Sequence, residues 1–151
     1  MFKKPGVTSI QKPIVTKISI KPTEGILGKI TNPTCYQEVI KDKSFSVKNA
    51  DKYLKEITSE LSLKHDLDFK SVKVRNYRSR WGSCSSTGSI FYNWKIIMAP
   101  KRIIKYVVLH ELVHTKIHNH SPRFWSYLKS IYDDINHPKK WLINNKNLLE
   151  I

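Results

Sequence analysis

The sequence predicts a single domain of the α+β class. Its 151 residues suit one core, because a chain of this length buries roughly 70% of its unfolded surface. The 40% content of hydrophobic residues excludes collagen-like and low-complexity classes. Short β-favouring segments precede segments with helical periodicity, in the order strands, helix, hairpin, three helices. This order predicts a small, mainly antiparallel N-terminal sheet with a backing helix, followed by C-terminal helices.

The N-terminal part of the chain reads as short strands. Residues 1–46 are β-favouring segments broken by proline and glycine, and residues 14–20 alternate between apolar and polar side chains. We therefore expect a small sheet or hairpin here. We expect residues 1–46 to be a β-rich extension or part of the sheet, residues 47–151 to form the main domain, and the whole to be one compact domain.

The next segment has the pattern of an amphipathic helix. From Val47 to about Leu63, apolar residues recur every three or four positions. Ser46 or Asn49 is a suitable N-cap for this helix. We expect the helix to back the sheet.

A hairpin is predicted to follow. Residues 69–77 alternate imperfectly between apolar and basic side chains, which favours a strand. Residues 80–88 are rich in small polar residues and indicate a turn, after which residues 89–94 return to β-type composition.

Three helices complete the predicted fold. Pro100 precedes an apolar stretch that predicts a long helix from residue 101 to about 118. Ser121 and Pro122 are a strong start signal for a helix over residues 122–134, with serine as N-cap and proline at the first helical position. A last short helix is expected over residues 139–149.

Basic residues are concentrated in the second half of the chain. The protein has 27 basic and 12 acidic side chains, a net charge of +15, which predicts an acidic partner such as DNA or RNA. Between residues 69 and 132, twelve basic side chains face one acid, giving +11: Lys70, Lys73, Arg75, Arg78, Arg80, Lys95, Lys101, Arg102, Lys105, Lys116, Arg123 and Lys129. A general bias of the composition toward lysine is the alternative explanation.

The sequence also favours a cytoplasmic protein. No apolar run is long enough to span a membrane, and no apolar segment follows the first lysines as in a secretion signal. Cys35 and Cys84 are too few for a disulfide scaffold. We expect no membrane partner.

The strongest chemical signal is an H-E-x-x-H motif. His110, Glu111 and His114 lie within a strongly apolar helical segment. On a helix the two histidines are about 40° apart on one face and about 6 Å apart along the axis, so both rings can reach one ion. Glu111 lies about 60° from His114 on the flank of that face, where it can contact a metal-bound water. Structural histidines with backbone partners are the alternative interpretation.

A catalytic zinc needs a third protein ligand, for which His118 and His120 are candidates. Three histidines along one straight helix would span about 12 Å, too far for three Zn–N bonds of about 2.1 Å. The helix should therefore end after His114, and the turn at Asn119 favours His120. His65 and His137 adjoin predicted loops and are expected on the surface.

These groups predict zinc-dependent peptide hydrolysis. Zinc lowers the pKa of its bound water, and Glu111 is placed to accept the proton and pass it to the leaving amine. The tetrahedral oxyanion needs a further donor, for which Arg80, Tyr106, Tyr127 and Tyr132 are candidates that sequence alone does not separate. A nucleic-acid-binding module with a structural or vestigial zinc is the competing hypothesis.

Several linked motifs extend this pattern. In order and spacing they resemble the YgjP-like zinc metallopeptidases over about residues 50–134: Arg80-Trp81-Gly82-Ser83-Cys84-Ser85, Asn93-Trp94, Met98-Ala99-Pro100, Tyr106-Val107-Val108, His110-Glu111-Leu112-Val113-His114 and Asn119-His120-Ser121-Pro122-Arg123-Phe124-Trp125.

The resemblance implies a minimal zincin-like domain with His110, His114 and His120 as zinc ligands and Glu111 as the catalytic residue. It also implies kinship with the WLM and SprT-like proteases, which cut proteins crosslinked to DNA. A metzincin is disfavoured, because Ile117 stands where the metzincin glycine would be. Cys84 is either a thiolate ligand that holds the enzyme latent or, as we favour, a small buried residue beside Trp81.

Overall fold

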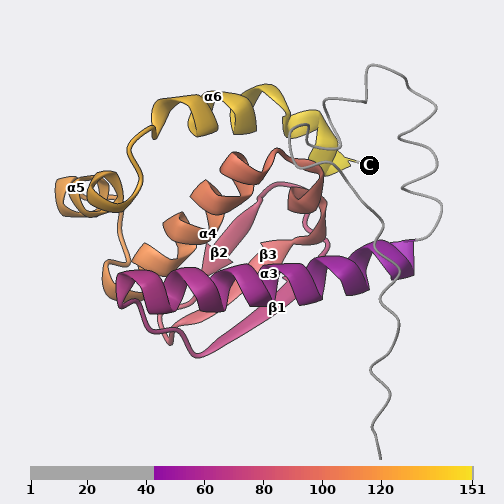
Figure 1. Ribbon diagram of the computed structural model, residues 1–151. Helices are drawn as coiled ribbons and strands as arrows, with labels where there is room; N and C mark the ends of the chain where they lie inside the picture. Colours follow the sequence, from indigo (N-terminus) through magenta and orange to yellow (C-terminus); the bar gives the residue numbers. More distant parts are fainter. Residues whose placement is uncertain (1–42, 151) are drawn as a thin grey trace, which may run out of the picture.

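The structure, a computed structural model, describes residues 43–150 (Figure 1). Its elements are α3 (Lys43–His65), β1 (Ser71–Arg75), β2 (Gly82–Cys84), β3 (Ser89–Asn93), the 3-10 turn η1 (Trp94–Met98), α4 (Lys101–Lys116), α5 (Pro122–Ile131), α6 (Asn136–Asn144) and the 3-10 turn η2 (Lys146–Glu150). Helices and a sheet in this order confirm the α+β class. The strand predicted at residues 14–20 lies outside the described residues.

The sheet is mixed, whereas the sequence predicted a mainly antiparallel one. Its strand order is β1-β3-β2. The predicted hairpin, in which residues 69–77 and 89–94 are joined by a turn at 80–88, is wrong, because β1 pairs with β3 in parallel, with Val72 opposite Ile90. Residues 82–84 of the predicted turn instead form β2, which makes an antiparallel hairpin with β3, with Gly82 opposite Tyr92. The hairpin therefore adds to β1 through its second strand, which leaves β2 on the far side of β3.

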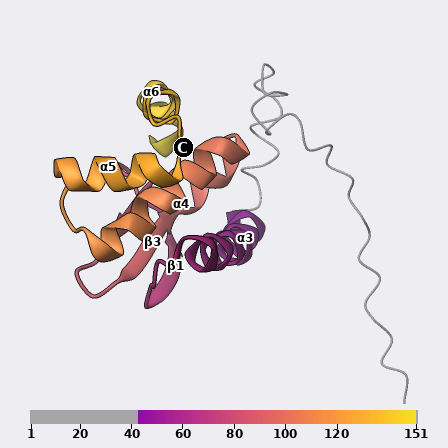
Figure 2. The same cartoon turned by 60° about the vertical axis from the view of Figure 1, so that its left-hand side comes forward.

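Helices α3 and α4 pack against the sheet and against each other (Figures 1 and 2). Ile90 and Tyr92 of β3 are fully buried in this core. Thr58 of α3 is also fully buried, and its hydroxyl donates a hydrogen bond to the Tyr92 hydroxyl at 3.2 Å. The backing helix was thus predicted correctly, but it begins at Lys43, so Ser46 and Asn49 lie inside it and neither is its cap.

Helix α4 runs through the centre of the domain and ends just before the predicted bend. Its buried residues include Ile104, Val108 and Leu112, so one face is fixed against the core. Ile117 has extended backbone angles of φ −132° and ψ 97°, and its N–H bonds to the Val113 carbonyl. The chain therefore leaves the helix after Lys116, two residues earlier than the pattern of apolar residues predicted.

Helices α5 and α6 complete the domain. α5 begins with Pro122 after an extended Ser121, as predicted, although the serine side chain makes no capping hydrogen bond. α6 begins at Asn136, packs against α4, and passes into η2. Of the described helices, none is long and apolar enough to cross a membrane.

Candidate metal centre and adjoining cavity

Three histidines converge at the C-terminal end of α4. His110 and His114 are one helical turn apart, and His120 comes from the segment between α4 and α5. Their Nε2 atoms are separated by 3.2 Å (110 to 114), 3.0 Å (114 to 120) and 2.9 Å (110 to 120). The bend after α4 thus brings His120 beside the motif histidines, as the helix geometry predicted. His118 is exposed and does not belong to this group.

The donor set fits a metal ion. Three ring nitrogens that face one another cannot all be satisfied by mutual hydrogen bonds, because a neutral imidazole has one donor and one acceptor. Tetrahedral zinc with Zn–N bonds of about 2.05 Å places its nitrogen ligands about 3.3 Å apart, close to the observed separations. His114 is buried and His120 is exposed, so the group opens to solvent on one side.

Neighbouring groups fix the orientation of two of these rings. The Nδ1 of His114 lies 3.0 Å from the Ile117 carbonyl, which can only accept. The proton of a neutral His114 therefore sits on Nδ1, and its Nε2 lone pair is free for a metal. From α5, Phe124 stacks on His114 with centroids 4.4 Å apart, and Trp125 stacks on His120 at 5.4 Å.

The electrostatic setting keeps His110 neutral. Burial lowers its pKa to about 3, with further lowering by the charges of His114, His120 and Lys139. A neutral imidazole is the form that binds metal ions. The His110 Nδ1 is buried without a hydrogen-bond partner among the described residues.

Glu111 is a buried carboxyl group beside these histidines. It is 6% exposed, and burial raises its pKa to about 8, opposed by the positive charge of Arg80. Gly82 of β2 lies directly against it: a Cβ at this position would be 2.9 Å from Oε1 of Glu111. The absence of a side chain at Gly82 therefore makes the space in which the carboxyl group lies.

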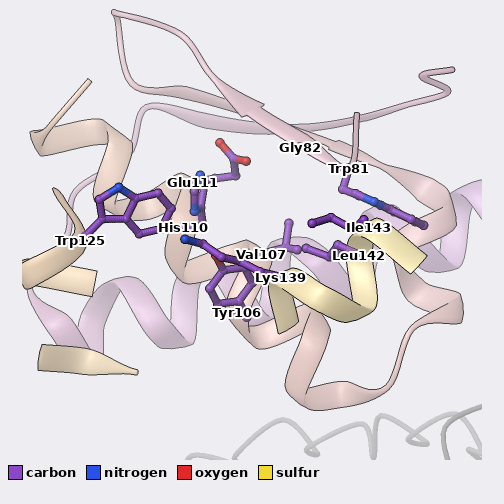
Figure 3. A pocket seen from close by; sticks show the side chains of 10 residues that line it. All are labelled: Trp81, Gly82, Tyr106, Val107, His110, Glu111, Trp125, Lys139, Leu142 and Ile143. Carbon is purple, nitrogen blue, oxygen red and sulfur yellow. The ribbon is translucent and has the colours of Figure 1, made fainter. Parts of the chain in front are cut away.

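A cavity of about 300 Å³ opens onto His110 and Glu111 (Figure 3). Its lining comes from α4, from β2 and the residue before it, and from α5 and α6: Tyr106, Val107, His110, Glu111, Trp81, Gly82, Trp125, Lys139, Leu142 and Ile143. His110 belongs both to this lining and to the histidine cluster, so the cavity adjoins the cluster.

The candidate donors differ in their position relative to this cavity. Tyr106 lines it and is buried, and burial raises its pKa to about 12, so its hydroxyl stays protonated. Arg80 is exposed and lies over the Tyr77 ring at 5.6 Å. Tyr127 and Tyr132 are absent from the lining, and the Tyr132 hydroxyl donates to the Arg102 carbonyl at 2.9 Å.

Sequence reasoning missed Lys139. Its Nζ lies 3.4 Å from the centroid of the Trp125 ring, a cation–π contact, and its charge acts on His110. Figure 3 shows the side chain directed from α6 toward these two residues. No local signal marks it, because its place depends on how α6 packs across α4.

Three further residues differ from expectation. Lys95 is 2% exposed and donates to the Leu149 carbonyl at 2.6 Å, so it contributes nothing to a basic surface. His65 is half-buried, with a buried Nε2, rather than a surface residue. Cys84 lies in β2 outside the histidine group and is half-buried rather than buried at a turn, and burial raises the pKa of its thiol to about 11.

Three histidines that could bind a metal ion thus lie at the end of a buried helix in an α+β fold, with a buried glutamate beside them. The chain belongs to the YgjP-like family, whose metallopeptidase domain matches residues 14–145. No curated protein matches it.

The fold is similar to that of a solved metallopeptidase. The crystal structure of the metallopeptidase zymogen of Methanocaldococcus jannaschii jannalysin matches with a TM-score of 0.54 and 20% sequence identity. The match covers 61% of this chain and 95% of that one.

Proposed function

We propose that this protein is a zinc-dependent peptidase in which His110, His114 and His120 hold the metal and Glu111 transfers the proton. The observation that carries the proposal is the convergence of three Nε2 atoms within 3.2 Å of one another. One of these histidines, His110, lines a cavity together with the buried Glu111. Three histidine ligands are a common protein set for a catalytic zinc.

A bound zinc ion supplies two kinds of chemistry here, a lowered pKa of water and polarisation of the substrate carbonyl. Glu111 is the proton carrier of the site. Burial raises the pKa of Glu111 to about 8, and a cation held by the histidines would lower this pKa by favouring the carboxylate. Glu111 then accepts the proton of the attacking water and delivers it to the leaving amine.

Tyr106 is the best placed of the predicted donors for the oxyanion. It lies one helical turn before His110, lines the cavity, and stays protonated. Its ring is held edge-on by Tyr132, with centroids 5.7 Å apart. A hydrogen bond that Tyr106 donates from this fixed position would stabilise negative charge on the oxyanion.

The test is hydrolysis of an unfolded protein by zinc-loaded enzyme, compared with Glu111→Gln and Tyr106→Phe. Glutamine keeps the size of the side chain but cannot carry a proton. We expect Glu111→Gln to lose at least about 100-fold in kcat with zinc retained, and Tyr106→Phe to lose about 10- to 100-fold. Equal rates for wild type and Glu111→Gln would refute the proposed mechanism.

A further inference from the structure

The cavity beside the histidine cluster has two unlike ends. At one end lie His110, Glu111 and Lys139, and at the other lie Leu142 and Ile143 (Figure 3). Lys139, Leu142 and Ile143 are spaced i, i+3 and i+4 on α6, so one face of this helix supplies the charged end and the apolar end. The reacting groups therefore adjoin an apolar hollow.

The hollow has the size for one large side chain. An apolar cavity of about 150 Å³ accommodates a benzene molecule, and this cavity measures about 300 Å³. Val107 forms part of its wall and is fixed in the core at 3% exposure, while Trp81 forms another part and packs on Trp141 with centroids 6.1 Å apart. These rigid apolar walls are suited to a leucine- or phenylalanine-sized group.

Ile143 marks the rim of this hollow. It is 62% exposed, and only two large hydrophobic residues among those described are exposed to this degree, the other being Leu63 at 85%. An apolar side chain bound in the cavity would cover part of Ile143. At the charged end, Trp125 is already in contact with the Lys139 ammonium. A substrate with its peptide group near His110 therefore directs an apolar side chain toward Leu142 and Ile143.

We propose that this cavity is the substrate subsite that selects a large apolar side chain next to the cleaved bond. The inference rests on the proposed peptidase function and adds its specificity. Burial of such a side chain relative to glycine gives about a 10- to 100-fold preference in kcat/KM. A charged side chain at the apolar end of the cavity is disfavoured, because Leu142 and Ile143 offer it no partner.

The first experiment maps cleavage sites in unfolded proteins by mass spectrometry. We expect leucine, phenylalanine and methionine to be enriched at one position beside the cleaved bond. Ile143→Ser should reduce this preference about 3- to 10-fold, and the matched control Leu63→Ser, on α3, should leave it unchanged. Both positions are exposed, so both variants are expected to fold.

The second experiment measures binding without catalysis. N-acetyl-phenylalanine amide and N-acetyl-glycine amide are titrated into metal-free protein while the indole N–H resonance of Trp81 is followed by NMR. We expect the phenylalanine probe alone to shift this resonance, and Ile143→Ser to weaken the response.

The two experiments separate the two claims. Peptide hydrolysis with no apolar preference, or equal responses to both probes, would overturn the subsite and leave the peptidase standing. Selective binding of the phenylalanine probe with no hydrolysis of any peptide would contradict the peptidase and leave an apolar binding site.

Discussion

Replacement of Gly82 by alanine tests how closely Glu111 is positioned. The added Cβ would lie 2.9 Å from Oε1, 3.0 Å from Cγ and 3.2 Å from Cδ of Glu111. Carbon atoms in contact prefer separations of about 3.5–4.0 Å. The carboxyl group must therefore move by roughly half an ångström to one ångström, because Gly82 is held in the sheet by its pairing with Tyr92 on β3.

The expected effect is large on catalysis and small on stability. A misplacement of about 1 Å at reacting groups costs on the order of 100-fold in rate, so we expect kcat to fall about 10- to 100-fold. Overpacking costs about 1–3 kcal/mol, partly offset by the reduced freedom of alanine in the unfolded chain, about 0.4–1 kcal/mol. The histidines are not touched, so zinc content should not change.

The assay combines steady-state hydrolysis of one peptide, zinc content and urea denaturation. Gly88→Ala is the matched control, because the nearest atom to its added Cβ is at 3.7 Å and the cost arises from its positive φ of 80° instead. That variant should lose about 1–2 kcal/mol of stability and keep the kcat of the folded enzyme. A Gly82→Ala enzyme with wild-type kcat would refute the claim that this glycine positions the carboxyl group.

Three further predictions follow from the site and the charge. Zinc at 100 times its Kd should raise the free energy of unfolding by about 2.7 kcal/mol, measured as a rise in melting temperature that a chelator reverses; no shift would contradict a folded-state metal site. In metal-free protein, Glu111→Gln should raise the free energy of unfolding by about 1–3 kcal/mol at pH 8 and by little near pH 4.5. The reason is that the pKa of Glu111 is about 8 in the folded protein against an ordinary value of 4.5, so the free energy of unfolding of the wild type falls as the pH rises between these values. If urea titrations gave a difference in free energy of unfolding between the two proteins that does not change with pH, this prediction would be contradicted. The net charge of residues 69–132 predicts that duplex DNA accelerates cleavage of DNA-binding proteins in a salt-sensitive way, and rates indifferent to DNA would leave the charge as a bias of composition.

The grouping of the three histidines could be predicted from the sequence, because it depends only on one helix and on the bend that follows the helix. The spacing of His110 and His114 fixes their common face, and Asn119 with Pro122 indicates where the chain turns back to bring His120 beside them. These relations are local, so helix geometry predicts them without knowledge of the rest of the fold.

The remaining features depend on contacts between distant segments. The parallel pairing of β1 with β3 is set by which strand of the hairpin meets β1, and nothing in the strand patterns records that choice. Lys139 reaches the site because α6 packs against α4, and Lys95 is buried at a position where Leu149 supplies a carbonyl to it. The net charge includes both lysines, although Lys139 lines the cavity and Lys95 is buried in the core.

The most direct test of the three-histidine site is the zinc content of purified protein prepared without chelator. Wild type, His110→Ala, His114→Ala and His120→Ala are compared with His118→Ala, which removes an exposed histidine outside the group. We predict about one zinc per chain in wild type and in His118→Ala, and a clear loss in the other three variants. Full zinc content in His120→Ala, or its loss in His118→Ala, would contradict the site.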